Sequence, residues 1–398
     1  MFFLLSNVYF SATSRPLAYA ASSITAFLLS QQRYSPCITL RSLFLANQSA
    51  TPMLKDFAAK YFKRSFICHI LLLKKMQAFK SNIIEANDVI ILLHGGVGRI
   101  HKEAISPETE HQYQEAIIHA LTEGQKIISC GGKSIDAVET AIRILEDCPL
   151  FNAGKGAVYA NNEMIELDAA IMDGKTLNAG SVAGVRTVKN PISAARKIID
   201  NSPHVMLVGS GADEFAKENG IEIVDQSYFK VKDRWQQIIK LKEETENNTD
   251  LFSKHPPTKL GTVGCVAIDE GGGLAAGTST GGMLNKKFGR VGDTPIIGAG
   301  TYANKICAVS CTGHGEYFIR HAVAHDICAM IEYKSIPVSV AVKEMIEEKL
   351  TNAGGVGGLI AMDANGNIAV NYNTEGMFYG FIKKYGTITV NICNMIIE

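Results

Sequence analysis

Apolar and polar positions from Val89 onward recur with the periods of strands and helices. The apolar run VIILLHGGVG predicts a short buried strand that begins at Val89 and ends in a glycine turn at Gly95-Gly96. Apolar residues at helical spacing predict a helix over residues 107–129, with Ser106 as a good N-cap. Further helices are predicted over 135–147, capped by Ser134, and over 190–200, 212–220, 317–333 and 339–350, with a buried strand over 204–211.

Two apolar hairpins stand out in the second half of the chain. The first lies in KLGTVGCVAIDEGGGLAAGTSTGG, from Lys259 to Gly282, and the second turns at Asn365-Gly366. Both contain an alanine, an aspartate, a glycine turn and a terminal T-x-G-M, which suggests neighbouring antiparallel strands of similar geometry. Because strands with helices on either side occur in both halves, the pattern predicts the α+β class, built as a layered sandwich.

The first hairpin places two threonines opposite each other. If its turn centres on Gly271, residue 262 pairs with residue 280, and directly opposed Cβ atoms lie about 5 Å apart on one face of the sheet. Thr262 and Thr280 are therefore predicted to lie side by side at one end of the sheet. Threonine favours strands, so this pair alone is typical of an ordinary stabilised hairpin.

The surroundings of Thr262 favour a chemical role over a merely structural one. Gly261 removes a side chain at the carbonyl that a nucleophile on the next residue would attack. A threonine hydroxyl needs a nearby base, and a free α-amino group, with a pKa of about 7.7–8.0, suits neutral pH. Attack of the Thr262 hydroxyl on the Gly261 carbonyl, followed by hydrolysis of the ester, would cut the chain and liberate that amine.

The composition restricts the remaining function classes. Of the 398 residues, 46% are hydrophobic, which is ample for a sizeable core, and 39 basic against 39 acidic residues give no net charge. A neutral chain has no broad electrostatic attraction to nucleic acid. Nine scattered cysteines without a C-x-x-C pair favour a reducing compartment over a disulfide framework or a zinc ribbon. No apolar run reaches the roughly 18 residues that span a bilayer. We therefore expect a cytoplasmic protein that binds no membrane.

Two segments differ from the rest of the chain. Residues 1–75 hold one acidic residue, Asp56, against several Lys and Arg, and this composition fits a transit peptide. A secretory signal and a true start at Met76 are the alternatives, and a leader of either kind would make the location organellar or exported. Residues 240–257 are charged and polar and end in two prolines, which predicts a mobile, exposed linker.

In combination, the motifs resemble the plant-type L-asparaginase / isoaspartyl peptidase family of N-terminal-nucleophile hydrolases. They are HGGVG, CPLFNAGKGAVY…ELDAAIMDG, GTVGCVAID…AAGTSTGGMLNKKFGRVGDTPIIGAGTYA and SCTGHGE, in the expected order between Val89 and Gly380. The resemblance implies a four-layer αββα sandwich that hydrolyses L-asparagine and β-aspartyl (isoaspartyl) dipeptides without a catalytic cofactor. It also implies self-cleavage into an α subunit, 76–261 with 240–261 as mobile linker, and a β subunit, 262–398. Two such α/β pairs would form a dimer.

The resemblance also implies which residues carry the chemistry. Thr262 is the nucleophile and the new N-terminus, and Thr280 orients its hydroxyl or amine. Asn152 in LFNAG supports the nucleophile. Thr312 and Gly313 in SCTGHG form the oxyanion hole, which suits a hydroxyl and a backbone N–H, since each donor is worth about 3 kcal/mol.

A second group of residues is implied to bind the substrate. Arg290 and Asp293 in GRVGD would bind its α-carboxylate and α-ammonium, respectively, together with Thr312, Gly313 and Gly315, which shapes the loop. A guanidinium suits a carboxylate by its bidentate fork. Without the family context, a surface salt bridge between the arginine and the aspartate is the ordinary interpretation.

One loop is implied to hold a structural sodium ion through backbone carbonyls, which are proper ligands for a hard cation. The residues that would supply these carbonyls are Leu145, Glu146, Cys148, Phe151, Ala153 and Lys155.

Other functions have weaker sequence support. His321 and His325, spaced i, i+4 with His314 nearby, could suggest a metal enzyme, but no Glu follows His321 and no base is placed. His314 could equally line the pocket mouth or be a solvated loop residue. Residues 205–216 lack the third glycine of a dinucleotide motif. Within the family, a glycosylasparaginase-type hydrolase is the alternative, and an uncleaved, non-catalytic binding protein is the alternative outside it.

Overall fold

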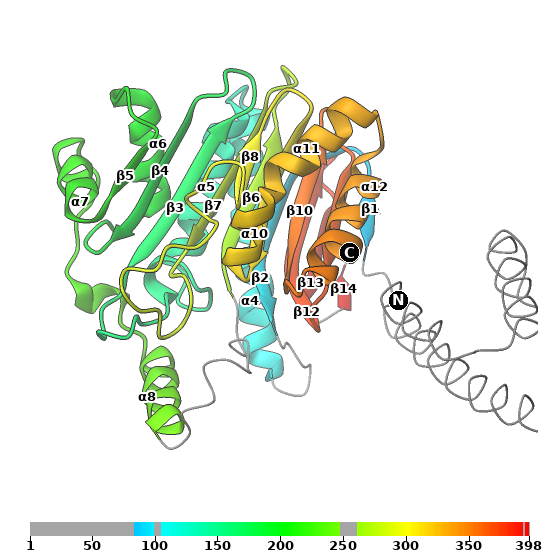
Figure 1. Cartoon of the computed structure of the whole chain (residues 1–398). Coiled ribbons are helices and arrows are strands. Elements are labelled where there is room, and N and C mark those ends of the chain that lie inside the picture. The colour runs from blue at the N-terminus through cyan, green and yellow to red at the C-terminus, as the bar shows by residue number, and fades with distance from the viewer. Residues whose placement is uncertain (1–82, 99–104, 247–260, 393–394, 398) are drawn as a thin grey trace, which may run out of the picture. The chain divides into compact units, whose positions relative to one another are not determined.

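The computed structural model describes residues 83–98, 105–246, 261–392 and 395–397. The predicted leader over residues 1–75 and the predicted linker from residue 247 lie outside the described residues. Within the body that begins at Ser81, two β-sheets pack face to face and each is covered by helices on its outer face (Figure 1). This arrangement confirms the αββα sandwich of the α+β class.

Within the described ranges, the larger sheet has nine strands, and its neighbouring strands are antiparallel except for β4 and β5. Its spatial order is β14 (Met395–Ile397), β13 (Ile388–Ile392), β12 (Gly376–Lys383), β2 (Val89–Gly98), β6 (Val263–Ile268), β7 (Leu274–Thr280), β3 (Leu167–Asp173), β4 (Ala179–Val185) and β5 (Met206–Val208).

The smaller sheet has five antiparallel strands. Its order is β1 (Ile84–Ala86), β11 (Ile368–Tyr372), β10 (Gly357–Asp363), β9 (Cys307–Gly313) and β8 (Thr301–Ala303). The two similar hairpins of the sequence therefore lie in different sheets, with β6–β7 in the larger and β10–β11 in the smaller. The two hairpins do not pair with each other, and they are neighbours only in that strand β10 faces β2 and β6 across the interior.

The helices form the two outer layers. Those of the N-terminal half are α4 (Pro107–Ser129), α5 (Ser134–Asp147), α6 (Pro191–Asn201), α7 (Gly209–Glu218) and α8 (Lys232–Glu246), with short turns η3 (Gly154–Gly156) and η4 (Gln226–Phe229). Those over the smaller sheet are α10 (Gly315–His321), α11 (Val323–Lys334), α12 (Val338–Lys343) and the π-helix η5 (Glu344–Leu350). No helix within the described ranges is long and apolar enough to cross a membrane.

Three apolar cores follow from the four layers. The first lies between the larger sheet and the helices α4 to α7, and contains Ile91, Leu121 and Val138. The second fills the space between the sheets, and the third lies between the smaller sheet and α10 to α12. Because strand residues alternate between the faces, His94 and Thr278 carry polar groups into the inner layer close to the strand ends.

Local geometry explains where helices begin. Pro107 is the first residue of α4, and the Ser106 hydroxyl accepts from the Thr109 backbone N–H at 3.2 Å, as predicted. At α5 the prediction is wrong, since Lys133 is the cap and Ser134 is the first helical residue. The Ser134 N–H instead donates to a carboxylate oxygen of Asp269 at 3.1 Å, which ties this helix to the β6–β7 turn.

Two predicted strands differ from the structure. The strand from Val89 does not end at Gly95-Gly96 but continues to Gly98, because β12 pairs with it beyond a β-bulge opposite Phe378. The predicted buried strand over 204–211 is only the three-residue edge strand β5, and α7 begins directly after it at Gly209. An edge strand has one neighbour, which explains why β5 is largely exposed.

Two helix boundaries also differ. The predicted helix over 317–333 is divided at Ala322, whose backbone is left-handed with φ of 45°, into α10 and α11. The predicted linker from Lys240 begins too early, because residues up to Glu246 continue α8. Ile238 of this helix is fully buried in the first core, and Lys242 pairs with Glu163 at 2.7 Å, so this stretch has partners that favour a helix.

Candidate active site

The two threonines lie side by side as predicted. Strands β6 and β7 pair with Val263 opposite Ser279, which sets Thr262 opposite Thr280 at the strand ends. The Thr262 hydroxyl lies 3.1 Å from the Thr280 hydroxyl, and both residues are buried. The Thr280 hydroxyl also accepts from the Gly282 backbone N–H at 2.9 Å, and this hydrogen bond fixes the orientation of the hydroxyl group.

The carbonyl oxygen of Gly261 is surrounded by hydrogen-bond donors. The Thr262 hydroxyl lies 2.7 Å from it, the Asn152 side-chain amide donates at 2.9 Å, and the Thr280 hydroxyl lies 3.4 Å away. Donors aimed at a carbonyl oxygen stabilise the negative charge that develops there when a nucleophile attacks the carbon. These donors therefore polarise the peptide bond between Gly261 and Thr262.

Asn152 occupies its position because all its polar groups are bonded. Its amide donates to the carbonyls of Gly261 and Gly282, at 2.9 and 2.8 Å, while its side-chain oxygen accepts from the Val158 N–H at 2.9 Å. Its backbone carbonyl accepts from the Gly281 N–H at 3.0 Å. The turn before η3 is thus bonded to Gly261 on one side of the threonine pair and to Gly281 and Gly282 on the other.

Gly96 is packed against the same peptide bond. A Cβ at this position would lie 2.7 Å from the Gly261 Cα and 2.8 Å from the Thr262 nitrogen, closer than side-chain carbons pack, and the backbone φ is +99°. Only glycine fits both the conformation and the space. The glycine pair of HGGVG therefore serves close approach of β2 to the peptide that would be cut, rather than a turn.

Beneath the threonines runs a buried chain of polar side chains. His94 Nε2 lies 3.0 Å from the Ser310 hydroxyl, which lies 2.7 Å from the Thr278 hydroxyl, and the Thr301 hydroxyl donates to Thr278 at 2.7 Å. Burial lowers the pKa of His94 to about 3, opposed by an interaction with the backbone of Thr262. The imidazole is therefore neutral at neutral pH and serves as a fixed hydrogen-bonding group beneath the nucleophile.

Arg290 and Asp293 lie together on the loop after β7, at the N-terminus of α10. The Arg290 guanidinium donates from Nε and Nη2 to the two carboxylate oxygens of Glu316, at 2.9 Å each. Asp293 is buried, and a Cβ at Gly315 would lie 2.8 Å from its Oδ1 and 2.9 Å from Arg290 Nη2. Gly315 therefore leaves room for both charged groups.

Two polar atoms of this region lack hydrogen-bond partners among the described residues. They are Asp293 Oδ2 and the Thr312 hydroxyl oxygen, both buried. Burial raises the pKa of Asp293 to about 7, although the nearby Arg290 charge lowers it. Thr312 and Gly313 end strand β9 and lead through His314 directly to Gly315. A buried polar atom without a partner is costly, so this side of the site is built to receive a polar ligand.

His314 lies beside the arginine–glutamate pair. Its Nε2 is 3.3 Å from a carboxylate oxygen of Glu316, and its ring is about one third exposed. No group of three or more His, Cys, Asp or Glu side chains that could hold a metal ion occurs among the residues that the structure describes. The geometry therefore gives no support to the metal-enzyme alternative built on the histidines.

The loop expected to hold sodium joins the end of α5 to η3. The Leu145 carbonyl accepts from the Cys148 N–H at 3.3 Å and the Ala153 carbonyl from the Gly156 N–H at 3.1 Å, so the loop is closed on itself. A Cβ at Gly154 would collide with the Glu146 carbonyl, so the start of η3 packs directly against the end of α5. Two of the six carbonyls expected to bind sodium, those of Leu145 and Ala153, already accept a backbone N–H.

The four-layer sandwich and the arrangement of the site around Thr262 are together typical of one class of protein. It is the class of N-terminal-nucleophile hydrolases, in which the residue that follows a cut in the chain provides both the hydroxyl and the amine. The chain belongs to the asparaginase family, whose sequence model matches residues 87–392.

Curated relatives agree with this assignment. The chain is 48% identical over 307 residues to an isoaspartyl peptidase of Escherichia coli strain K12, a match that covers 76% of this chain and 95% of that protein. It is 40% identical over 325 residues, with 76% and 98% covered, to a probable isoaspartyl peptidase/L-asparaginase 2 of Arabidopsis thaliana. A plant-type L-asparaginase of Pyrococcus abyssi is 43% identical over 302 residues, with 74% and 97% covered.

Sequence reasoning missed two residues of the site. Glu316 grips Arg290 with both carboxylate oxygens, and Gly96 allows the close approach of β2 to Gly261. Glu316 follows the oxyanion motif directly in GHGEY, so the pairing of an acidic residue there with an arginine elsewhere could have been considered. The role of Gly96 depends on a contact across the sheet that no local pattern reveals.

Proposed function

We propose that this protein is an autoprocessing threonine hydrolase. It cleaves the side-chain amide of L-asparagine and the isopeptide bond of β-aspartyl dipeptides. The observation that carries the proposal is the Thr262 hydroxyl, 2.7 Å from the carbonyl oxygen of the peptide bond that precedes it, beside the Asn152 and Thr280 donors. The names of the relatives support the substrate class.

Maturation begins from this arrangement. The Thr262 oxygen attacks the Gly261 carbonyl carbon, the amide C–N bond breaks, and the nitrogen takes a proton to become the free amine of Thr262. The resulting ester between the Gly261 acyl group and the Thr262 oxygen is hydrolysed by water. Asn152 and Thr280 donate to the oxygen that becomes negative in the tetrahedral intermediate. The products are an α subunit that ends at Gly261 and a β subunit over residues 262–398.

Turnover then uses the liberated amine as the base. The amine accepts the proton of the Thr262 hydroxyl, whose oxygen attacks the side-chain carbonyl of the substrate. Ammonia, or the amine of a second amino acid, leaves, and water releases aspartate from the acyl-enzyme. The Thr312 hydroxyl and the Gly313 N–H are assigned to the oxyanion, since the Thr312 oxygen is buried and has no partner among the described residues.

The substrate's head group would be bound by opposite charges. The α-carboxylate takes the free edge of the Arg290 guanidinium, because Glu316 occupies the edge formed by Nε and Nη2. The α-ammonium takes the partner-free Oδ2 of Asp293. Both substrate types share this aspartyl head group and differ in the leaving amine, so one site serves both.

The remaining expectations belong to the same proposal. The loop from Leu145 to Lys155 would hold a structural sodium ion that takes no part in bond making. Two α/β pairs would assemble as a dimer acting in the cytoplasm on small-molecule substrates. Equilibrium dialysis with sodium and sedimentation of the cleaved protein measure the first two of these.

The decisive test compares Thr262→Ala with Thr262→Ser. On a denaturing gel, the unmodified 43.1 kDa chain should give two fragments, and N-terminal sequencing should find Thr262 first in the smaller. Thr262→Ala should stay whole and lose ammonia release from asparagine and cleavage of β-Asp-Leu by on the order of 10⁴-fold or more. Thr262→Ser should keep both activities in part. A Thr262→Ala protein that is cleaved and active would exclude the proposal.

A further inference from the structure

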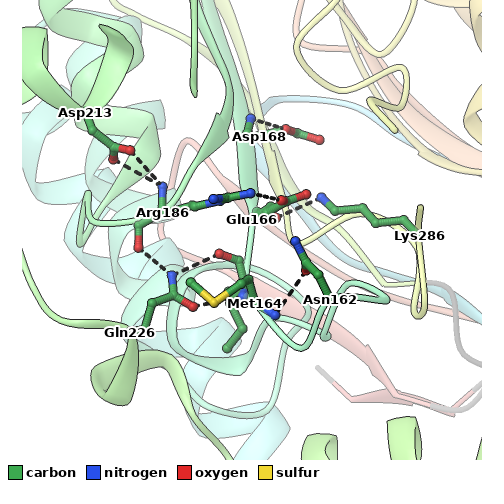
Figure 2. A network of polar contacts seen from close by, with 10 residues as sticks. Asn162, Met164, Glu166, Asp168, Arg186, Asp213, Gln226 and Lys286 are labelled. Atoms are coloured by element: carbon green, nitrogen blue, oxygen red, sulfur yellow. Dashed lines mark hydrogen bonds and ion pairs between the residues drawn. The ribbon is translucent and has the colours of Figure 1, made fainter. Parts of the chain in front are cut away.

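Lys286 is buried in the loop that connects the nucleophile to the substrate-binding residues. Only 5% of the residue is exposed, which is rare for lysine. Its ammonium donates to the backbone carbonyl of Glu166 on the segment leading into β3, at 2.9 Å. Figure 2 shows the side chain reaching Glu166 from one side while Arg186 approaches the Glu166 carboxylate from the other, at 2.6 Å.

The backbone around Lys286 is fastened to the same N-terminal segment. The Asn161 N–H donates to the Lys286 carbonyl at 2.9 Å, and the Asn285 N–H donates to the Tyr159 carbonyl at 2.8 Å. The side-chain amides of Asn161 and Asn285 are joined at 2.8 Å. Asn285 has a left-handed backbone, with φ of 63°, which turns the chain so that Lys286 points inward.

A buried carboxylate compensates the charge of Lys286. Asp168 pairs with Thr280 across β3 and β7, is fully buried, and accepts from the Gly184 N–H at 2.8 Å. Burial raises the pKa of Asp168, and the nearby Lys286 ammonium opposes this rise more than any other charge does. Burial likewise lowers the pKa of Lys286, and Asp168 is the first charge that opposes it. Each of the two opposite charges therefore partly offsets the effect of burial on the pKa of the other.

We propose that Lys286 is a positioning residue that sets the loop carrying Arg290 and Asp293 at the correct place against β3. This inference rests on the proposed function and adds a residue to it. The same ammonium lies beside Gly282, where a Cβ would approach it to 3.0 Å, and Gly282 in turn bonds Asn152 and Thr280. Lys286 thus fixes the middle of a loop whose two ends carry the nucleophile's support and the head-group site.

Self-cleavage makes the contact of Lys286 with the segment leading into β3 important. After cleavage before Thr262, Lys286 belongs to the β subunit, while Glu166 and Asp168 belong to the α subunit. The hydrogen bond from Lys286 to the Glu166 carbonyl is then non-covalent and joins the two fragments. A buried ammonium has few alternative partners, so it defines one register of loop and strand, whereas apolar contacts would tolerate small shifts. A shift of about 1 Å in a substrate-positioning group costs up to 10²-fold in rate.

The test replaces Lys286 with methionine, which keeps the length and removes the charge. The control is Lys175→Met, because Lys175 is an exposed lysine in the turn after β3. We expect Lys286→Met to raise KM for asparagine about 10- to 100-fold, with a smaller change in kcat and an unchanged rate of self-cleavage. Lys175→Met should match the unmodified protein in all three quantities.

A double variant covers the case in which the single one does not fold. Asp168→Asn with Lys286→Met removes both buried charges together, so no carboxylate is left uncompensated. A folded, self-cleaved single or double variant with unmodified KM would overturn the inference, as would equal loss of self-cleavage and turnover. If the unmodified protein hydrolyses neither substrate, the proposed function itself fails, and the two failures are thereby distinguished.

Discussion

The nucleophile region and the head-group region of the site differ in how far their hydrogen bonds are satisfied. The polar side-chain atoms of Thr262, Thr280 and Asn152 themselves have partners within the chain, including the Gly261 carbonyl. Around Asp293 and Thr312, each residue keeps a buried oxygen without a partner among the described residues. One region is complete before any substrate binds, and the other requires a ligand to become complete.

This difference teaches what each region is built for. The Gly261 carbonyl fills the nucleophile region as the first substrate, so that region should carry out self-cleavage without help from the head-group region. The buried oxygens without hydrogen-bond partners in the head-group region lower the stability of the fold, since each such buried polar group costs about 1–3 kcal/mol. That cost is recovered when the substrate binds. The comparison predicts that variants of the nucleophile region impair both self-cleavage and turnover. Variants of the head-group region should impair turnover alone.

After Thr262 itself, the largest expected effect belongs to Asn152 in the nucleophile region. Asn152→Leu keeps the side-chain shape but removes the amide that donates to the Gly261 carbonyl. Self-cleavage, followed on gels over time, should slow about 10²- to 10³-fold, the cost of one oxyanion donor, and turnover should fall with it. Asn178→Leu, an exposed asparagine before β4, is the control. Self-cleavage at the unmodified rate in Asn152→Leu would contradict the role of this amide.

In the head-group region, Asp293 predicts a pH dependence of ligand binding. Burial raises its pKa to about 7 against the Arg290 charge, with Glu316 and Asp168 raising it further. Only the ionised carboxylate pairs with the ligand's ammonium, so lowering the pH through about 7 removes the binding form. Calorimetry with the product L-aspartate should show Kd rising about tenfold per pH unit below 7.

Asp293→Asn provides the comparison for this pH dependence. The variant should bind L-aspartate weakly, with little change in Kd between pH 5 and 7, because the titrating carboxyl is gone. Its self-cleavage should proceed as in the unmodified protein. A Kd for the unmodified protein that is flat over this range would show that Asp293 is ionised throughout or does not meet the ammonium.

The sequence predicted the nucleophile region better than the head-group region, for a physical reason. Thr262 and Thr280 are related by a hairpin, whose register follows from its turn, so counting residues was enough to pair them. Glu316 meets Arg290 across a loop and a helix end, and Lys286 meets Glu166 across 120 residues. Such contacts depend on how layers pack, and no local period encodes that packing.

The errors in the fold have the same origin. Gly95-Gly96 has the composition of a turn, but pairing with β12 keeps it in the strand. Residues 240–246 have the composition of a linker, yet α8 continues through them because Ile238 is anchored in the core. In both cases the tertiary partner decides the outcome, and local composition is outweighed.

The smallest expected effect tests whether Glu316 orients the Arg290 guanidinium or competes with the substrate's carboxylate for it. Glu316→Gln keeps one acceptor but removes the charge that fixes the guanidinium, and the pair is partly exposed. We expect KM for asparagine to rise about three- to tenfold, roughly 1 kcal/mol, with kcat and self-cleavage unchanged. Glu344→Gln, which breaks a surface pair with Lys334 on the outer helices, is the control. A lower KM in Glu316→Gln would mean that Glu316 competes with the substrate's carboxylate for Arg290 instead of orienting it.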